Sequence, residues 1–294
     1  MDIAFIAAII AVFGFTFGDI VTAVTTRKIT ANKAVLVITL LKTLIYVPFI
    51  FLWQDELSQL TLGTGLWIVG LGTLFAISYR AFFDALEIGN ATIVGVIAGV
   101  FPAIAALVSI IFLGERPSLV LICLLISVIS AAVWLGLMTT GKKKLTFDKG
   151  TKLAFFVMIA WGFCFGLRKY PIDAIGTPHA WLLVQFGIAL TMTVVLFAVY
   201  RKYAKASLNF TGYPRNILFL IVLAALSVGI GEGSESLALA TSHTTPVAIV
   251  SGSYPALYAV LSRLFFKDPV NKKQWIAIGY IAFVVILLGF LRST

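Results

Sequence analysis

Two acidic residues in an otherwise apolar stretch are the first candidates for chemistry. Glu232 and Glu235 lie in the apolar block 216–240, three positions apart, so their side chains share one face of a helix. A carboxylate in such a block is costly unless it lines water or meets a cation. The pair therefore predicts recognition of an ammonium group or a proton-coupling site. The alternatives are solvation near the helix end, or ion pairing with Arg168 or Lys169.

Further charged residues lie inside other apolar blocks. Tracing each block along the chain places them toward one common side of the molecule, with both signs of charge present. We expect either a gate of ion pairs on that side, centred on Asp19 and Arg80, or a fixed structural cluster. The residues concerned are Asp19, Lys42, Arg80, Asp84 and Arg263.

Several aromatic residues occur in the blocks that would surround a central path. Tyr and Trp combine an apolar ring with a polar group, so they can pack against a substrate and also bond to it. We expect these residues either to bind substrate or to pack in the helix core. They are Phe15, Tyr79, Phe101, Trp161 and Tyr254.

The composition indicates the solvent for which the chain is built. Hydrophobic residues make up 61% of the 294 residues, charged residues 12%, and the mean hydropathy is +1.06. Soluble domains are about 45–50% apolar and about 25% charged. The apolar residues fall into ten blocks, each close to the roughly 20 residues that span a bilayer. The blocks are 3–24, 34–53, 65–86, 92–113, 118–138, 152–170, 178–200, 216–240, 245–266 and 273–291.

The second half of the sequence repeats the first. Phe13-Gly-Phe-Thr-Phe-Gly18 recurs as Trp161-Gly-Phe-Cys-Phe-Gly166, and Phe101-Pro-Ala103 recurs as Tyr254-Pro-Ala256. Each unit would hold five helices, and five is odd, so the second unit enters the membrane from the opposite side. This predicts an all-α membrane protein with two inverted five-helix repeats, the arrangement of many secondary transporters. We divide the chain into a first repeat (1–140), a connecting loop (141–151) and a second repeat (152–294).

The end of the fourth block carries a more specific pattern. Phe101-Pro102 followed by Leu113-Gly114-Glu115-Arg116 resembles the signature of EamA-type members of the drug/metabolite transporter superfamily. The second repeat departs from it, because Phe266-Lys267-Asp268-Pro269 stands at the equivalent place, although an acid remains there. The resemblance implies a ten-helix permease for small metabolites, often amino acids, with a central cavity and no use of ATP.

The basic residues predict an orientation. Most Lys and Arg residues fall in the loops after the first, fifth, seventh and ninth blocks, and such loops are usually cytoplasmic. Both termini would then face outward, whereas the resemblance implies cytoplasmic termini. The net charge of +10 fits this loop pattern better than a nucleic-acid surface.

Two prolines near the middle of their blocks, Pro102 and Pro255, predict helix kinks that either bend during transport or shape the bundle statically. Gly14, Gly18 and their counterparts in the second repeat predict close helix crossings.

The leading hypothesis is a secondary transporter for a small polar, zwitterionic or cationic metabolite, an amino acid or amine, working by alternating access in the cell membrane. The alternative is a non-transporting receptor or scaffold with the same fold. No catalytic constellation, metal cluster or cofactor motif is found, so we expect neither an enzyme nor a cofactor. The expected partners are the substrate, the lipid bilayer and a coupled proton, but not nucleic acid, and the protein would be a monomer or homodimer.

Overall fold

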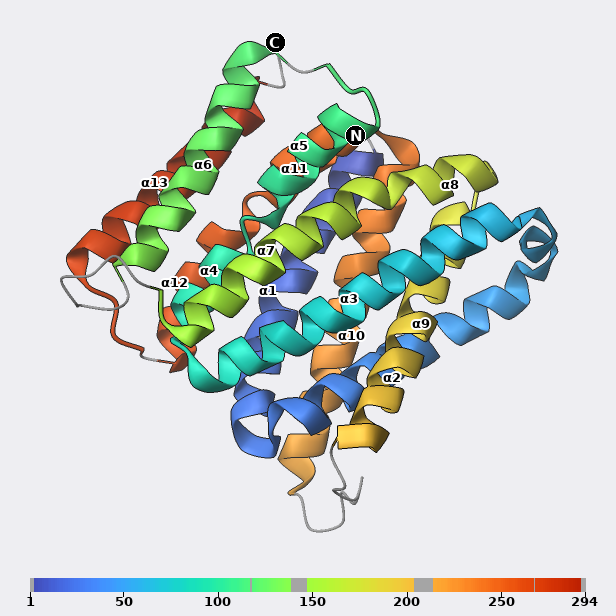
Figure 1. The fold of residues 1–294 in the computed structure, drawn as a ribbon, viewed down its shortest axis with the longest axis horizontal. Coiled ribbons are helices and arrows are strands. Elements are labelled where there is room, and N and C mark those ends of the chain that lie inside the picture. The colour runs from blue at the N-terminus through green and yellow to red at the C-terminus, as the bar shows by residue number, and fades with distance from the viewer. Residues whose placement is uncertain (1–2, 117, 139–146, 204–213, 267, 292–294) are drawn as a thin grey trace.

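The fold is a bundle of long helices (Figure 1), known from a computed structural model that describes residues 3–116, 118–138, 147–203, 214–266 and 268–291. No strand occurs in these ranges. The first repeat contains α1 (Ile3–Ile29), α2 (Ala31–Leu52), η1 (Gln54–Gln59), α3 (Leu62–Ile88), α4 (Ala91–Ala98), α5 (Phe101–Phe112) and α6 (Leu119–Leu137). The second contains α7 (Lys149–Leu167), α8 (Lys169–Ile175), α9 (Ala180–Tyr203), α10 (Arg215–Thr241), α11 (Thr244–Ser251), α12 (Tyr254–Phe266) and α13 (Lys272–Leu291).

Nine segments of the described chain are long and apolar enough to cross a membrane. Three of them combine two consecutive helices: α4 with α5, α7 with α8, and α11 with α12. Helix α13 completes the second set of five. The chain is thus an all-α membrane protein, as its apolar blocks predict. Large apolar side chains point outward along the helices, for example Leu62, Ile111 and Leu264, and lipid is the solvent that suits them.

The two repeats run in opposite directions through the bundle. Helix α4 packs on α12, and α5 packs on α11, so the fourth and ninth spans lie antiparallel. Two hydroxyl contacts repeat each other across this crossing. Thr92 meets Ser262 at 3.1 Å, and Ser109 meets Thr245 at 3.3 Å. Because Thr92 corresponds to Thr245 and Ser109 to Ser262, the two contacts are related by a two-fold pseudo-symmetry, as an inverted repeat requires.

The acid that ends each of these spans caps the broken helix of the other repeat. Glu115 accepts the backbone N–H of Thr244 (2.7 Å) and of Thr245 (2.9 Å) at the start of α11. Asp268 accepts the backbone N–H of Ala91 (2.8 Å) at the start of α4 and pairs with Arg27 (3.1 Å). A carboxylate stabilises the positive N-terminal end of a helix and satisfies its free N–H groups. The glutamate of the Leu-Gly-Glu pattern therefore caps a helix of the other repeat, and Asp268 has the same role in the second repeat.

The prolines do not kink continuous helices, so that expectation is corrected. The fourth span breaks at Gly99–Val100, and Pro102 stands in the first turn of α5. The ninth span breaks at Gly252–Ser253, and Pro255 stands in the first turn of α12. A first-turn proline loses no hydrogen bond, because its missing N–H would have had no partner within the helix.

Glycines allow α1 and α10 to approach each other closely. A Cβ atom on Gly14 would lie 2.6 Å from the Cα of Gly231, and one on Gly18 would lie 2.6 Å from a Val228 methyl group. In the second repeat, Gly162 and Gly166 allow α7 to approach α5, since a Cβ atom on Gly162 would lie 2.3 Å from Ile104 and one on Gly166 2.9 Å from Ala105. The predicted close crossings are therefore confirmed. They pull α1, α5, α7 and α10 together around the centre of the bundle.

Candidate functional site

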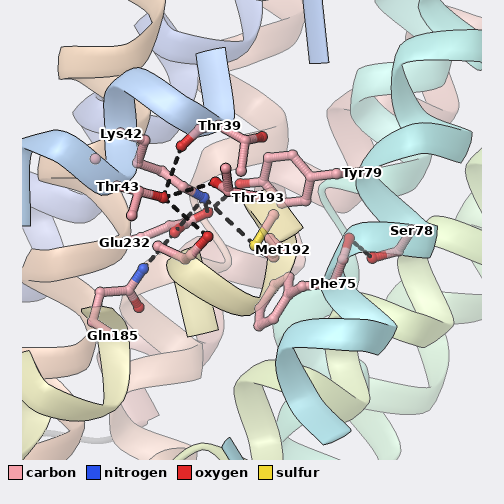
Figure 2. Close-up of polar contacts among 12 residues, drawn as sticks. Thr39, Lys42, Thr43, Phe75, Ser78, Tyr79, Gln185, Met192, Thr193 and Glu232 are labelled. Carbon is pink, nitrogen blue, oxygen red and sulfur yellow. Dashed lines mark hydrogen bonds and ion pairs between the residues drawn. The ribbon is translucent and has the colours of Figure 1, made fainter. Parts of the chain in front are cut away.

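A buried ion pair between two distant helices lies at the centre of the bundle (Figure 2). Lys42, near the middle of α2, places its Nζ 2.8 Å from both carboxylate oxygens of Glu232 on α10. Both side chains are 1% exposed. Lys42 therefore does not belong to the ion-pair cluster predicted nearer the membrane surface. The middle of α2 lies too deep in the bundle for contact with that cluster, and the carboxylate that pairs with Lys42 is that of Glu232.

Two neutral donors complete the environment of this carboxylate. The Tyr79 hydroxyl donates to Oε1 of Glu232, and the Gln185 side-chain amide donates to Oε2 at 2.5 Å. The Lys42 ammonium also lies 4.7 Å from the centre of the Tyr79 ring. A buried charge is tolerated only when it is paired and hydrogen-bonded, and Glu232 meets both conditions.

The same site lies on the pseudo-symmetry axis. Tyr79 and Glu232 occupy equivalent positions in the two repeats and bond to each other. Nearby, the hydroxyls of Thr43 on α2 and Thr193 on α9 are 2.9 Å apart. Helices α2 and α9 pack along each other here. The ion pair thus lies where the two repeats meet, which is where substrates bind in inverted-repeat transporters.

Arg168 is a second buried cation near this site. It lies between α7 and α8, is 0% exposed, and donates from Nη1 to the Ser236 hydroxyl at 2.8 Å. Ser236 in turn donates to Gln185 (3.1 Å), which links the arginine to the donors around Glu232. The sequence analysis placed Arg168 near the end of the block 152–170, as one possible partner of the two acids, and the structure places it inside the bundle. The guanidinium is buried because the sixth span continues into α8 beyond it.

The five aromatic residues singled out in the sequence form one buried cluster. Phe15 lies 6.0 Å from Phe101 and 6.3 Å from Tyr254, and Trp161 lies 5.7 Å from Phe101 and 5.3 Å from Tyr79, measured between ring centres. Their edge-to-face and tilted arrangements are those that aromatic rings prefer. The cluster lies beside the ion pair through Tyr79. Substrate binding by these rings stays a prediction.

The two remaining central acids have different surroundings. Asp19 on α1 accepts a hydrogen bond from the Tyr254 hydroxyl and is 6% exposed. Glu235 is 3% exposed, and its Oε2 has no hydrogen-bond partner among the described residues. Within those residues no group of three or more His, Cys, Asp or Glu side chains could hold a metal ion.

The predicted gate residues do not form one cluster. Arg80 pairs with Asp84 on the same helix at 2.7 Å, and Arg263 donates to the backbone oxygen of Asp268 at 2.7 Å. Asp19 bonds to neither arginine in the described contacts, because it lies deeper, beside Tyr254. The expectation of a gate that joins Asp19 with Arg80, Arg263 or Lys42 is therefore wrong in its pairing for this conformation.

The central ion pair is closed to solvent, and two hollows described elsewhere on the molecule do not reach it. One, of about 510 Å³, lies beside the start of α11 and is lined by Glu115, His243, Thr245 and Ile249 among others. The other, of about 470 Å³, lies between α3 and α7 and includes Trp67, Leu71 and Phe163.

Sequence reasoning named Arg168 only as a possible ion-pair partner of the two acids and missed Gln185, although both residues leave a signal. Arg168 follows Trp161 by seven positions and Phe165 by three, a helical spacing that places it on the inward face of a continued helix. Gln185 is a single amide within the apolar block 178–200. A polar side chain in such a block is expected to face the bundle interior.

Comparison with known proteins agrees with this architecture. A crystal structure aligns with a TM-score of 0.71 over 98% of this chain and 97% of the other, at 17% identity, and this similarity shows the fold alone. The "Uncharacterized transporter YyaM" of Bacillus subtilis (strain 168) is 29% identical over 129 residues, which are 43% of this chain and 39% of that protein. The family model described as "EamA-like transporter family" matches residues 2–137 and again residues 148–290. The chain therefore belongs to the EamA-like transporter family, within the drug/metabolite transporter superfamily.

Proposed function

We propose that this membrane transporter moves a small zwitterionic or cationic metabolite, an amino acid or amine, by alternating access. The observation that supports this is the Lys42–Glu232 pair, sealed at the meeting point of the two repeats. Glu232 has the charge that an ammonium group requires. In the structure the Lys42 ammonium occupies the place of such a cation, so a substrate amine would compete with Lys42 for the same oxygens.

The caps suggest how access alternates. Glu115 closes the bundle where α11 begins, and Asp268 closes it on the opposite side, where α4 begins. Because the two repeats are similar in shape and opposite in direction, exchanging their conformations would open one cap while the other stays closed. Each broken span supplies a point of movement, at Gly99–Val100 and at Gly252–Ser253.

Flux through proteoliposomes tests this proposal. Purified protein is reconstituted, and uptake of radiolabelled amino acids and primary amines is measured against empty liposomes. Glu232→Gln keeps the shape of the side chain and removes the charge, so it should abolish uptake of the transported compound. Asp55→Asn, which neutralises an exposed acid in η1, is the matched control and should transport normally. Wild-type uptake by Glu232→Gln would contradict the assignment, and no uptake of any compound by the wild type would contradict the proposed substrate class.

Proton coupling forms the second part of the proposal, and Glu235 is the candidate carrier. It is buried, and one of its oxygens has no partner among the described residues, whereas Glu232 is fully engaged. An inward-directed pH gradient should accelerate wild-type uptake. Glu235→Gln should retain substrate binding and lose that acceleration, and a full response in this variant would exclude Glu235 as the carrier. We place the protein in the cell membrane, which fractionation of the native host can test.

A further inference from the structure

Arg168 is held in an unusual position for a cationic side chain. It is 0% exposed, and its guanidinium carbon lies 4.3 Å from the centre of the Phe165 ring and 5.0 Å from that of Phe75. Two aromatic faces fix the plane of the guanidinium and attract its charge. The side chain is therefore positioned before any substrate arrives.

Only one of the three guanidinium nitrogens of Arg168, Nη1, makes hydrogen bonds to the described residues. Nη1 donates to the Ser236 hydroxyl at 2.8 Å and lies 3.4 Å from the backbone oxygen of Glu232. Nε and Nη2 have no hydrogen-bond partner among the described residues. These two atoms form one edge of the guanidinium, and this edge can hold both oxygens of a carboxylate through parallel hydrogen bonds. Buried donors without partners are costly, so a structure that keeps them has a reason to do so.

We propose that the Nε–Nη2 edge of Arg168 binds the carboxylate of the transported substrate. This rests on the proposed function and narrows it, because an amine without a carboxylate would leave the edge empty. Arg168 touches the backbone of the residue whose side chain would hold the substrate ammonium. An amino acid carries its ammonium and carboxylate groups on one carbon atom, so its binding site needs an anionic and a cationic side chain close together. The aromatic cluster, which includes Phe101 and Trp161, would face its side chain.

The experiment compares three forms of the proteinogenic amino acids: free, as methyl esters, and N-acetylated. Binding is measured by calorimetry in detergent at a pH where the ester amine stays protonated. Wild type should bind a free amino acid about 10- to 100-fold more tightly than its ester, the factor expected from charge-assisted hydrogen bonds. Arg168→Lys keeps the buried charge, and therefore the fold, but loses the fork. It should reduce this preference to about threefold or less and leave ester affinity unchanged.

Two controls separate a binding role from a structural one. Lys169→Gln removes the adjacent cation, which pairs with Asp173 at 3.0 Å, and should keep the wild-type preference. Arg168→Gln should give the same loss of preference as Arg168→Lys, and the melting temperature reports whether it folds. If Arg168→Lys weakens free acid and ester equally, or if wild type binds both equally, the carboxylate site is refuted and the amine site at Glu232 stands. If wild type binds no form, both proposals fall.

Discussion

Removing one partner of the central ion pair should destabilise the protein more than removing both. In Lys42→Met, the Glu232 carboxylate stays buried without its cation. Truncating one partner of a buried pair costs about 3–5 kcal/mol, whereas replacing both by neutral groups is often nearly neutral. Tyr79 and Gln185 still donate to the carboxylate, so we expect a value near the lower end, about 3 kcal/mol. The double variant Lys42→Met/Glu232→Gln should lie within about 1 kcal/mol of wild type.

A double-mutant cycle measures this coupling. Unfolding of wild type, both single variants and the double variant is followed by SDS titration in mixed micelles. The Arg80–Asp84 pair is the control, since it has a similar distance of 2.7 Å but side chains that are 28% and 34% exposed. Breaking it should cost only about 0–1 kcal/mol. Additive effects in the Lys42–Glu232 cycle, or an equal cost at both pairs, would show that burial does not set the strength of the central pair.

Three further predictions concern packing, pH and orientation. Gly14→Ala should cost about 1–3 kcal/mol, because its Cβ would lie 2.6 Å from an α10 backbone carbon, whereas Gly65→Ala meets open space and should unfold like wild type. Burial raises the pKa of Glu115, but hydrogen bonds from the start of α11 outweigh it and hold the pKa below its usual 4.5. The Glu115 carboxylate therefore stabilises the fold above about pH 4.5, and this stabilisation is lost as the pH falls through the lower pKa of the folded state. Wild type and Glu115→Gln should differ in melting temperature at neutral pH, and the two melting temperatures should converge in acid. If the basic loops are cytoplasmic, Ser58→Cys should react with an impermeant thiol reagent from outside the cell and Lys273→Cys should not, and the reverse pattern would invert the topology.

The membrane helices and the repeat could be read from the sequence because both are properties of local pattern. Runs of apolar residues give the spans directly. The matched Pro and Gly positions relate the two halves, and an odd number of helices then fixes their opposite directions. The five aromatic candidates also came together as one cluster, and two of them, Phe101 and Tyr254, are equivalent positions of the repeat.

The partners of the buried charges could not be read in the same way. Lys42 and Glu232 are 190 residues apart, and their pairing depends on how deep each lies and which way each helix is rotated. The hydropathy of a block fixes neither quantity. Arg168 stands near the end of the block 152–170, at a helix break between α7 and α8, so the sequence does not show how deep it lies. The chain stays buried at a short break of this kind, so the end of the helix does not mark the end of the membrane span.

The charges at the axis show why the two repeats cannot be identical. A residue on a two-fold axis meets its own equivalent, so an acid at both positions would place two carboxylates in contact, and at least one would have to be protonated. Here Tyr79 faces Glu232, so a neutral donor replaces the second acid. At the two ends of the bundle, by contrast, both equivalent positions hold an acid, because Glu115 and Asp268 each cap a helix of the other repeat. The two repeats thus share an acid at both ends of the bundle and differ at the axis, where a single carboxylate faces a neutral donor.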